Sequence, residues 1–452
     1  MIAWLAVPAF AGGYYYADSG IIANGRGCAY VAGADGQFAQ YYNPAGLIRV
    51  NRPTFNVGMT GVQQAISFTR FDAATETYAE PVQNEGGMFA VPEFGFATPI
   101  GDDFSFGFGF TSGFSPAYQF PESGAQRYTI IDTTIWNFQI GPTVAWRPVP
   151  WFTVALGPQW QALRVDEKLK VTISGRDDPS GDVAVDAQTW DKFQPGMNAG
   201  ILVEPVKQLS IGAMVQPGAS FHARGPGVLD FTGNALEDLL DQKVYTDDDI
   251  ALALKLPWFI RTGVAVRPRE NVEIEADFVY ETWSAIHELV VTDIDIHVTG
   301  ANGLIDTPVE STIELPAGFH DTYSVRLGGE WQPKPWLELR TGGFFERSSM
   351  DADSVSVALI DTPKFMVGGG ASVHVWGDRL VLDGALSTVF YKDLVIRDST
   401  VHQINVYGGN EAVVGNGDIT SQGLAVGLAM RWQFTDPQRP RDPWSESTDS
   451  TL

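Results

Sequence analysis

The side chains that most often perform chemistry are few and scattered in this chain. His287 and Glu288 begin a His-Glu-x-x-His zinc motif, but position 291 is valine, so the second helical ligand is missing. The six histidines, at positions 222, 287, 297, 320, 374 and 402, show no ligand spacing. Neither a Gly-x-Ser-x-Gly elbow nor a phosphate-binding loop occurs. We therefore expect no enzyme, no catalytic residues, no cofactor and no metal site.

Charge limits the partners that the chain can bind. It carries 54 acidic against 29 basic residues, a net charge of -25, which argues against nucleic acid, because phosphates need a basic footprint. We expect the acidic stretches 176–182 and 247–249 to be solvated loops; the alternative is that they bind Ca²⁺ or bridge lipopolysaccharide through divalent ions. Cys28 is the single cysteine, and we interpret it as a small buried residue.

The length of 452 residues fits several soluble domains or one large barrel. No apolar run reaches the roughly 18 residues that a membrane-spanning helix needs, so a membrane role requires strands. An apolar run over 2–7 leads to Ala9-Phe10-Ala11, a small-x-small cleavage pattern, and we expect 1–11 to be the remnant of a secretory signal. A buried N-terminal strand is the alternative. The segment 435–452, rich in Pro, Ser and Asp, is expected to be a disordered periplasmic tail.

Most of the chain alternates apolar with small or polar residues. Over 104–111, Phe-Ser-Phe-Gly-Phe-Gly-Phe-Thr places four phenylalanines on one face of a strand. Over 423–434, large apolar residues alternate with Gly, Ala, Arg and Gln. An apolar face of this kind is the core of a soluble sandwich or the lipid-facing side of a membrane barrel.

The opposite face of four neighbouring strands is charged. These strands carry a mixed-sign ladder made of Arg261, Arg267, Glu273, Glu275, Asp277, Arg326, Glu330, Glu338 and Arg340. A solvated outer face of a sandwich is one interpretation and the polar lumen of a barrel is the other. We favour the lumen, where the ladder can bind a plug that carries Arg26, Asp35 and Arg49.

Connection lengths alternate between short and long. Short turns, rich in Pro, Gly and Asp, fall at 99–103, 148–150, 205–208, 268–271, 333–335 and 377–378. Longer polar connections lie near 71–90, 113–130, 176–188, 222–254, 289–318, 349–362 and 398–418. Seven long and six short connections predict 14 strands, with both termini on the side of the short turns. Trp146 and Trp151 flank one short turn, and Trp331 and Trp336 flank another, as in an interfacial aromatic belt.

Residues 25–47 differ from everything downstream. This stretch, GRGCAYVAGADGQFAQYYNPAGL, is rich in Gly and Ala, has no helical or strand period, and ends in a turn at Asn43-Pro44. A compact irregular segment before many hairpins predicts a plug inside a closed barrel, because non-helical backbone is tolerated at membrane depth only where protein surrounds it.

The same segment resembles the hatch of FadL-like outer-membrane transporters, which take up long-chain fatty acids and aromatic hydrocarbons. That hatch has a Gly-x-Gly-x-Ala run, an acidic residue and a final Asn-Pro-Ala, here Gly25, Gly27, Ala29, Asp35 and Asn43-Pro44-Ala45. The resemblance covers nearly the whole chain. Together with the strand pattern it implies an all-β fold: a 14-stranded antiparallel transmembrane β-barrel over 53–434 in the bacterial outer membrane, with an N-terminal plug over 12–50 in its lumen.

An apolar groove that captures ligand is expected on the outward loops. Within 222–254, residues 232–242 predict a short amphipathic helix, since Leu236, Leu239 and Leu240 recur at i, i+3, i+4 spacing after Leu229 and Phe231. Packing on a neighbouring loop is the alternative. In the loop after the third strand, Phe114, Tyr118 and Phe120 are expected to form the opposite wall. Arg127 of the same loop is expected to meet a substrate carboxylate.

The resemblance also implies a mechanism. A hydrophobic ligand is captured at the loops, passes passively to a pocket bounded by the plug, and is released when the plug rearranges near Asn43-Pro44-Ala45. Family members open a kinked strand sideways into the membrane, and here Gly107, Gly109 and Gly113 make the third strand the candidate. Expected partners are this ligand, outer-membrane lipid and lipopolysaccharide, with the protein a monomer. A general porin, a barrel enzyme and a structural or adhesive barrel remain alternatives.

Overall fold

The wall of the molecule is one antiparallel sheet that closes on itself. The computed structural model describes residues 19–114, 116–173, 175–246, 250–286, 288–300, 305–316, 318–376, 379–404 and 412–434. The wall strands are β1 (Thr54–Asp72), β4 (Phe89–Ile100), β5 (Phe104–Phe114), β7 (Asp132–Val149), β8 (Phe152–Thr172), β9 (Asp182–Val206), β10 (Leu209–Gln216), β15 (Phe259–Arg269), β16 (Val272–Glu281), β19 (Thr322–Lys334), β20 (Leu337–Glu346), β21 (Lys364–Val375), β22 (Leu380–Tyr391) and β24 (Gly417–Gln433).

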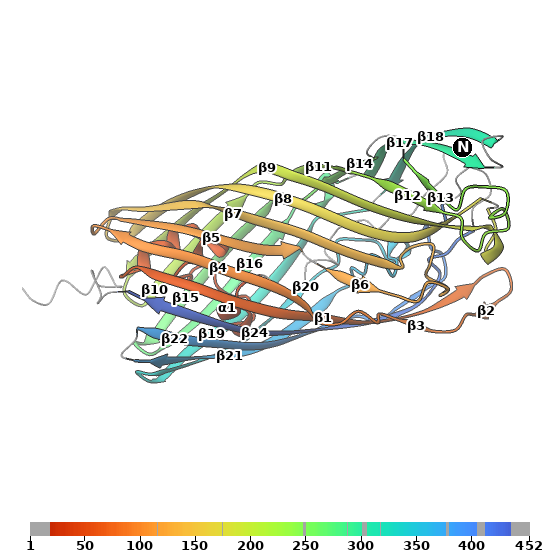
Figure 1. Ribbon diagram of the computed structural model, residues 1–452. Helices are drawn as coiled ribbons and strands as arrows, with labels where there is room; N and C mark the ends of the chain where they lie inside the picture. The colour runs from red at the N-terminus through yellow and green to blue at the C-terminus, as the bar shows by residue number, and fades with distance from the viewer. Residues whose placement is uncertain are drawn as a thin grey trace, which may run out of the picture.

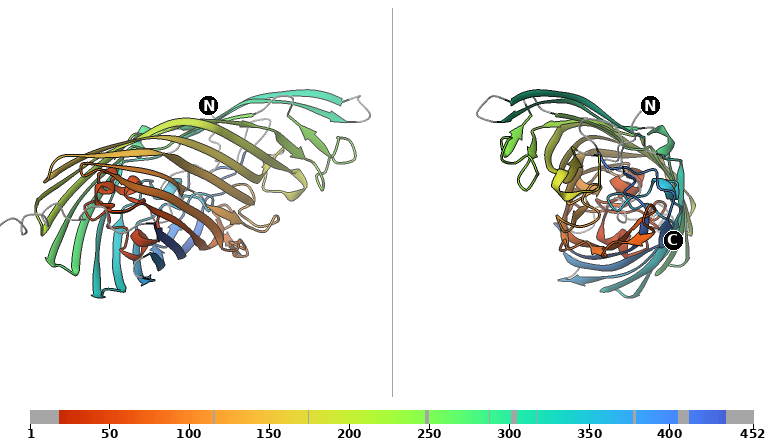
Figure 2. Two further views of the ribbon diagram at one scale, coloured as in Figure 1. Left: turned by 60° about the vertical axis from the view of Figure 1, so that its left-hand side comes forward. Right: turned by 90° about the vertical axis from the view of Figure 1, so that its right-hand side faces the viewer.

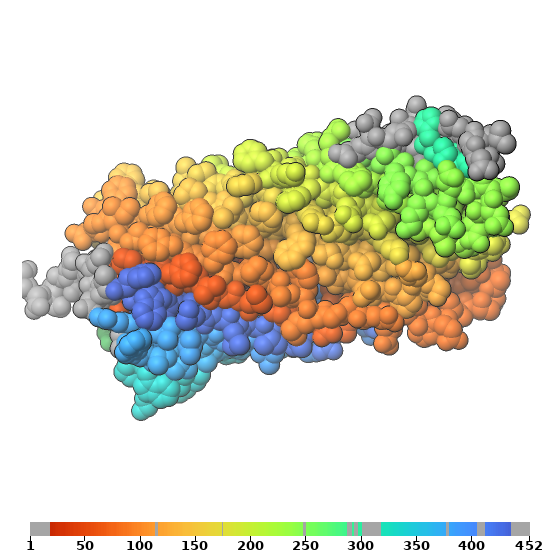
Figure 3. Space-filling model, in the orientation of Figure 1, coloured from red at the N-terminus to blue at the C-terminus, as the bar shows by residue number. Residues whose placement is uncertain are grey.

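Each wall strand pairs with the next, and β24 pairs back with β1 from Thr54↔Gln433 to Arg70↔Gly417. The ring therefore has no free edge along its length. This confirms the predicted 14-stranded antiparallel barrel. In the space-filling view, β1 and β24, the first and last strands, lie side by side on the surface (Figure 3).

Further strands lie at the end of the barrel that carries the long connections (Figure 1). They are β2 (Thr77–Tyr78), β3 (Val82–Gln83), β6 (Ala117–Gln119), β11 (Ser220–Gly225), β12 (Gly227–Asp230), β13 (Lys243–Tyr245), β14 (Ile250–Lys255), β17 (Glu288–Gly300), β18 (Ile305–Pro316) and β23 (Leu394–Ile396). At the opposite end the connections are tight, as between β9 and β10 and between β15 and β16. Helices are restricted to short segments, and within the described residues no helix is long and apolar enough to cross a bilayer.

The apolar faces of the strands point outward. On β5, the side chains of Phe104 and Phe108 are 42% and 37% exposed. On β24, Leu428 is 71% exposed, whereas its neighbour Ala425 on the inner face is 2% exposed. A soluble fold would bury these rows, so the exposed faces must meet hydrocarbon instead.

Indole rings mark one end of this apolar band. Trp146, Trp151, Trp331 and Trp336 all stand exposed beside the short turns, as predicted. Trp376 and Trp432 pack edge to face at the same end, with ring centroids 6.0 Å apart. Rings with an apolar body and one polar N–H favour the boundary between lipid and water, so this end of the barrel lies at an interface.

The N-terminal segment lies inside the barrel (Figure 2, right). It contains α1 (Ile21–Gly25), α2 (Ala39–Tyr42) and a 3-10 helix, η2 (Pro44–Arg49), and nearly all of residues 19–52 are buried. We call residues 19–52 the plug. Its many Gly and Ala residues permit the close approach to the wall that a narrow lumen requires.

Some expectations about connections were wrong or fall outside the described residues. Residues 182–188 belong to β9, a strand of 25 residues, so the long connection predicted over 176–188 shrinks to a turn that contains η3 (Pro179–Gly181). The helix predicted over 232–242 is a series of turns instead. The turn 377–378, the acidic stretch 247–249, the proposed signal remnant 1–11 and the proposed tail 435–452 lie outside the described residues.

We predict that Gly27→Ala unseats the plug. Gly27 has φ 63°, and a Cβ there would lie 1.9 Å from the backbone nitrogen of Gly343 on β20. Gly36 is a matched control, because its φ is 68° but a Cβ at this position would have no neighbouring atom within 4 Å. We expect Gly36→Ala to cost about 1 kcal/mol of unfolding free energy from its left-handed backbone alone. Gly27→Ala is expected to cost about 4 kcal/mol or more.

The measurement is denaturant unfolding of both variants in detergent, together with protease cleavage within the plug. Equal losses for the two variants would show that contact with β20 does not hold the plug.

Candidate functional site

The plug is fixed to the wall through buried ion pairs. Arg26, 2% exposed, donates from Nη2 to Glu273 Oε1 at 2.7 Å and to Glu275 Oε2 at 2.8 Å, both on β16. Arg49 donates from Nη2 to Glu204 Oε1 on β9 at 2.9 Å. Removing one partner of such a buried pair leaves an uncompensated charge, typically at a cost of about 3–5 kcal/mol. These pairs therefore set the position of the plug at both of its ends.

Carboxylates on β16 also accept hydrogen bonds from the plug backbone. Asp277 Oδ2 accepts from the N–H groups of Tyr30 at 2.7 Å and Val31 at 3.1 Å. Glu275 Oε1 accepts from those of Ala32 at 2.5 Å and Gly33 at 3.0 Å. Four consecutive N–H groups that have no helix or sheet partner are thus satisfied by two side chains of one strand.

The cations of the ladder serve the plug in the same way. Arg261 Nη1 on β15 donates to Tyr41 O at 2.9 Å, and Arg326 Nη1 on β19 donates to Cys28 O at 3.3 Å. The other ladder residues bind one another on the inner wall: Arg267 with Glu273, and Arg340 with Glu330 and Glu338. The structure therefore brings all nine predicted ladder residues to the lumen.

The Asn43-Pro44-Ala45 turn caps η2 and ties it to the barrel. The Asn43 carboxamide accepts from Ala45 N at 3.2 Å, and its Nδ2 donates to Val31 O at 3.0 Å and to Ile201 O of β9 at 2.9 Å. Pro44 starts the helix without needing an N–H partner. Asp35, by contrast, stays within the plug and accepts from the Tyr30 hydroxyl at 2.5 Å.

Glycines of β5 receive side chains from the plug. A Cβ at Gly107 would meet Leu47, one at Gly109 would meet Gln40 and one at Gly113 would meet Tyr41. The pairing of β5 with β7 shifts register between Thr111 and Phe114, which is the irregularity expected of a kinked strand. Side-chain-free positions and a register shift thus coincide on the third wall strand.

Sequence reasoning missed several residues of this network. Besides Glu204, they include Ser210, Ser372, Asp383 and Arg431. Alternation alone could have found Glu204 and Asp383, since each lies on the inward-facing register of its strand. Pairings between residues 155 or more positions apart, such as Arg49 with Glu204, have no signal in one sequence.

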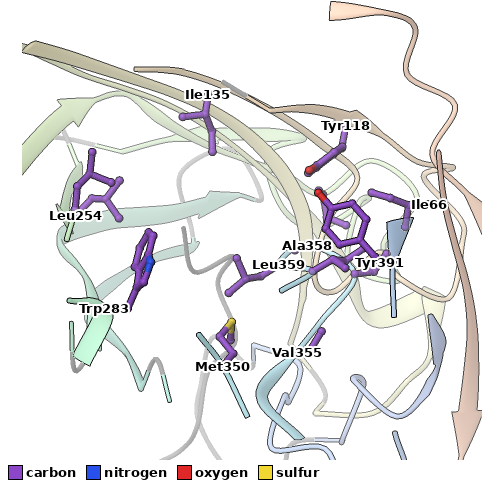
Figure 4. Close-up of a cluster of buried hydrophobic side chains, with 14 of the residues drawn as sticks. Ile66, Tyr118, Ile135, Leu254, Trp283, Met350, Val355, Ala358, Leu359 and Tyr391 are labelled. Atoms are coloured by element: carbon purple, nitrogen blue, oxygen red, sulfur yellow. The ribbon is translucent and has the colours of Figure 1, made fainter. Parts of the chain in front are cut away.

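Beyond the plug, toward the long loops, the lumen is apolar. One buried cluster gathers residues from the inner wall and the loops, including Ile66, Tyr118, Phe120, Ile135, Leu254, Trp283, Met350, Val355, Leu359 and Tyr391. We call the part of the lumen that this cluster occupies the chamber. In Figure 4, Leu359 lies between Trp283 on one side and Tyr391 on the other.

Part of the connection 347–363 folds into the chamber instead of standing in water. Val355, Val357, Ala358, Leu359 and Ile360 are all at most 4% exposed. Ser356 and Leu359 exchange backbone hydrogen bonds at 3.2 and 3.0 Å, which makes a tight hairpin tip. We call residues 355–360 the inserted tip; the polar character of the flanking residues had predicted an outward loop.

The predicted loop ligands divide between several places. Tyr118 and Phe120 lie in the chamber. Leu229, Phe231 and Leu240 pack in a separate loop cluster with Val171 and Val298, which matches the alternative of packing on a neighbouring loop. Leu236 and Leu239 are exposed, at 37% and 54%. The backbone of Phe114 pairs with Asn137 at the end of β5.

Arg127 already has carboxylate partners. Its Nε donates to Asp182 Oδ2 and its Nη2 to Asp177 Oδ1, both at 2.7 Å. The guanidinium also lies over the ring of Tyr128, whose hydroxyl donates to Asp182 at 2.6 Å. Burial and the bond to Asp182 raise the pKa of this phenol. The arrangement fastens two loops together, so the predicted meeting of Arg127 with a substrate carboxylate would require displacing Asp177 or Asp182.

The other face of the plug borders a polar cavity of about 710 Å³ at the end with the short turns. Its lining includes Arg26, Arg49, Glu204, Arg267 and Glu330. The plug thus separates an apolar space from a polar one. Among the described residues, no group of three or more His, Cys, Asp or Glu side chains is arranged to hold a metal ion.

These features define a class of protein: a membrane β-barrel with a plugged lumen and an apolar chamber above the plug. The family described as outer membrane protein transport protein (OMPP1/FadL/TodX) matches residues 2–435. The chain belongs to this family, which makes it an outer-membrane transport protein and not an enzyme.

Individual relatives are distant. A long-chain fatty acid transport protein of Escherichia coli O6:H1 is 23% identical over 374 residues, covering 76% of this chain and 79% of the relative. Among solved structures, a Pseudomonas aeruginosa FadL homologue superposes with a TM-score of 0.76 at 15% identity and covers 94% of this chain and 100% of its own. The Pseudomonas putida toluene transporter TodX gives 0.65 at 13% identity, covering 96% and 100%. At these identities the two structures establish the fold.

We predict that Asp277→Ala loosens the plug. The substitution orphans the buried N–H groups of Tyr30 and Val31, each at a cost of about 1–3 kcal/mol. Asp277→Asn keeps an acceptor oxygen and should lose less. The measurements are ion conductance in planar bilayers and protease cleavage of the plug, both of which should rise in the alanine variant.

Asp321→Ala provides the control. Asp321 accepts from Ser284 N at 3.0 Å and from the Tyr280 hydroxyl at 2.5 Å, and both of these donors lie outside the plug. Conductance that rises as much in Asp321→Ala as in Asp277→Ala would contradict a specific role of β16 in holding the plug.

Proposed function

We propose that this protein carries hydrophobic small molecules passively across the outer membrane, through the chamber and past the plug. The observation that carries the proposal is the division of the lumen into an apolar chamber and a polar, ion-paired floor. Relatives named for transport of long-chain fatty acids and of toluene support hydrophobic cargo. Each CH₂ moved from water into the chamber contributes about 0.8 kcal/mol.

The first step is capture at the outward loops. The exposed Leu236 and Leu239 offer an apolar surface there, and Tyr118 and Phe120 line the chamber on the side of the loop after β5. Cargo that reaches the chamber takes the place of the inserted tip, whose Val, Ala, Leu and Ile side chains provide the same apolar contacts. When apolar cargo replaces the apolar tip, the buried apolar area of the chamber changes little. The step therefore needs no energy source.

Release requires the plug to move, because the plug spans the lumen between the chamber and the polar cavity. Two routes are compatible with the contacts. Movement of Leu47, Gln40 and Tyr41 away from β5 would uncover the glycines of the kinked strand and open a path sideways. Movement of Arg26 and Arg49 away from β16 and β9 would open the cavity beneath. We favour the sideways route, because apolar cargo would reach lipid directly there instead of crossing a charged cavity.

A general porin is less compatible with this lumen. Porins conduct through a water-filled channel, whereas here nearly all of residues 19–52 are buried against the wall. The chamber is also lined by Ile, Leu, Val, Phe and Trp, which repel ions.

A tether between plug and wall tests the mechanism. A Cβ built on Gly25 would lie 3.7 Å from the Ala385 Cβ on β22, a separation that suits a disulfide. In a Cys28→Ser background, the pair Gly25→Cys and Ala385→Cys should form this bond on oxidation. We expect uptake of oleate and of toluene to fall at least about tenfold in the oxidised form and to recover with reductant.

Each single-cysteine variant is the control, because it lacks the tether under both conditions. Full uptake by the oxidised pair would overturn movement of the plug as one body while leaving transport intact. If the untethered protein carries neither oleate nor toluene, and Asn43→Ala changes nothing, transport of hydrophobic cargo itself is wrong.

A further inference from the structure

A belt of polar side chains crosses the inner wall where the chamber meets the plug. It consists of Glu281 on β16, Glu346 on β20, Lys364 on β21 and Tyr391 on β22, and we call these four residues the belt. Strand register aligns three of them, since Glu346 pairs with Lys364 and Lys364 pairs with Tyr391. Glu281 lies two residues from this level, because Glu281 pairs with Thr322 whereas Glu346 pairs with Ser324. Glu281 and Glu346 are each 1% exposed, so the belt belongs to the interior of the molecule.

The belt borders the chamber directly. The indole of Trp283, a chamber residue, donates from Nε1 to Glu281 Oε2 at 2.7 Å. Tyr391 is itself in the chamber cluster, and Figure 4 shows its hydroxyl turned toward that of Tyr118. Lys364 Nζ lies 6.0 Å from the centre of the Tyr391 ring. A molecule in the chamber therefore meets the belt at its end nearest the plug.

The cations at this level already have protein acceptors. Lys364 Nζ donates to Glu346 Oε1 at 2.5 Å and to Asp361 Oδ1 at 3.4 Å. Arg326 donates to Ser324 Oγ at 3.1 Å and to Cys28 O at 3.3 Å. Arg261 donates to Tyr41 O at 2.9 Å.

Two carboxylate oxygens and one phenol of the belt have unfilled hydrogen-bonding capacity. Glu281 Oε1, Glu346 Oε2 and the Tyr391 hydroxyl are buried and have no hydrogen-bond partner. A buried carboxylate oxygen without a donor is costly, and the cost is removed by any group that brings an O–H. A hydroxyl group attached to an apolar body would complete the belt, because it can donate to a carboxylate oxygen and accept from the Tyr391 O–H.

We propose that the belt binds the hydroxyl group of neutral amphipathic cargo, a long-chain alcohol or an alkylphenol, with its apolar part in the chamber. This inference rests on the proposed transport function. The hydroxyl donates to Glu281 Oε1 or Glu346 Oε2, and the Tyr391 hydroxyl completes the contact. A carboxylate at the same place would bring acceptors but no donor to Glu281 and Glu346, and an ether would likewise leave their oxygens without a donor.

The inserted tip determines when the belt is accessible. Leu359 lies in the centre of the chamber (Figure 4), and Asp361, at the base of the tip, shares Lys364 with Glu346. An alkyl chain replaces the apolar contacts of the tip, but only a cargo with a donor also satisfies the belt. Selection among cargoes therefore depends on a hydrogen-bond donor, which the apolar side chains of the tip cannot supply.

Binding of matched ligands by the full chain in detergent tests this proposal. Dodecanol and its methyl ether differ only in the donor, and hexylphenol and hexylanisole repeat the comparison with an aromatic body; dodecanoate is the acid. We expect each hydroxyl compound to bind about tenfold to a hundredfold more tightly than its ether. Glu281→Gln and Tyr391→Phe should each reduce that ratio by about threefold or more, with ether binding unchanged.

Glu270→Gln is the matched control, because the Glu270 side chain is 89% exposed at a short turn. Thermal unfolding of each variant shows whether the barrel is intact, and Tyr391→Phe removes a hydroxyl without breaking a hydrogen bond. Equal affinity for alcohol and ether, or a stronger preference for dodecanoate, would overturn the hydroxyl assignment while leaving hydrophobic transport in place. Failure of all five compounds to bind would instead contradict the proposed function.

Discussion

The buried ionic contact between the plug and β16 is the interaction on which the rest of the structure depends. A barrel in hydrocarbon must turn its apolar side chains outward, so its inner faces are left with charged and small residues. Those charges need partners, because an unpaired ion in a closed lumen is expensive. Arg26 and the backbone N–H groups from Tyr30 to Gly33 supply them.

The same contact explains why the plug has so little regular structure. A helix would satisfy its own N–H groups and leave Glu275 and Asp277 without donors. The irregular segment 26–33 instead directs successive N–H groups toward the wall, and Cys28 even adopts φ 61° to do so. Glycines on two neighbouring wall strands, β19 and β20, allow this approach. The Arg26 carbonyl oxygen would lie 2.0 Å from a Cβ at Gly328 and 2.1 Å from a Cβ at Gly342. Plug and wall are therefore complementary in backbone as well as in charge.

Much of this architecture can be predicted from the sequence because it follows from period-2 alternation. Position in the alternation alone predicts that the phenylalanines of β5 face outward. It also predicts that the ladder on β15, β16, β19 and β20 faces inward. Elements whose conformation depends on distant partners could not be predicted. Residues 232–242 have helical spacing, yet their backbone bonds go partly to other segments: Ala235 donates to Ser180 and Asp241 to Thr299. Tertiary contacts override the local preference there.

The inserted tip shows the same limit for function. The sequence of the tip, Val-Ser-Val-Ala-Leu-Ile, has the apolar and polar pattern of a short strand or loop. Only the hydrogen bonds at its base show that it turns inward. Ser349 donates from N and from Oγ to Asp361 at 2.5 Å, closing the base of the loop, while Asp353 O accepts from Ser399 and Thr400. Glu281, Glu346, Lys364 and Tyr391 likewise come from separate strands, so single-strand patterns place each one in the lumen without placing them together.

Cargo choice in such a protein depends on few residues. Hydrophobic burial is non-directional, so the apolar chamber accepts many shapes and discriminates weakly between cargoes of similar size. Directional selectivity has to come from polar atoms at the border of the chamber, and among the described groups these include the carboxylate oxygens of Glu281 and Glu346 and the hydroxyl of Tyr391. Two solved structures at 13–15% identity share the fold, which is consistent with a wall fixed by alternation alone. Changes of a few residues at the level of the belt would then alter the cargo while the plug contacts and the closure of β1 on β24 stay the same.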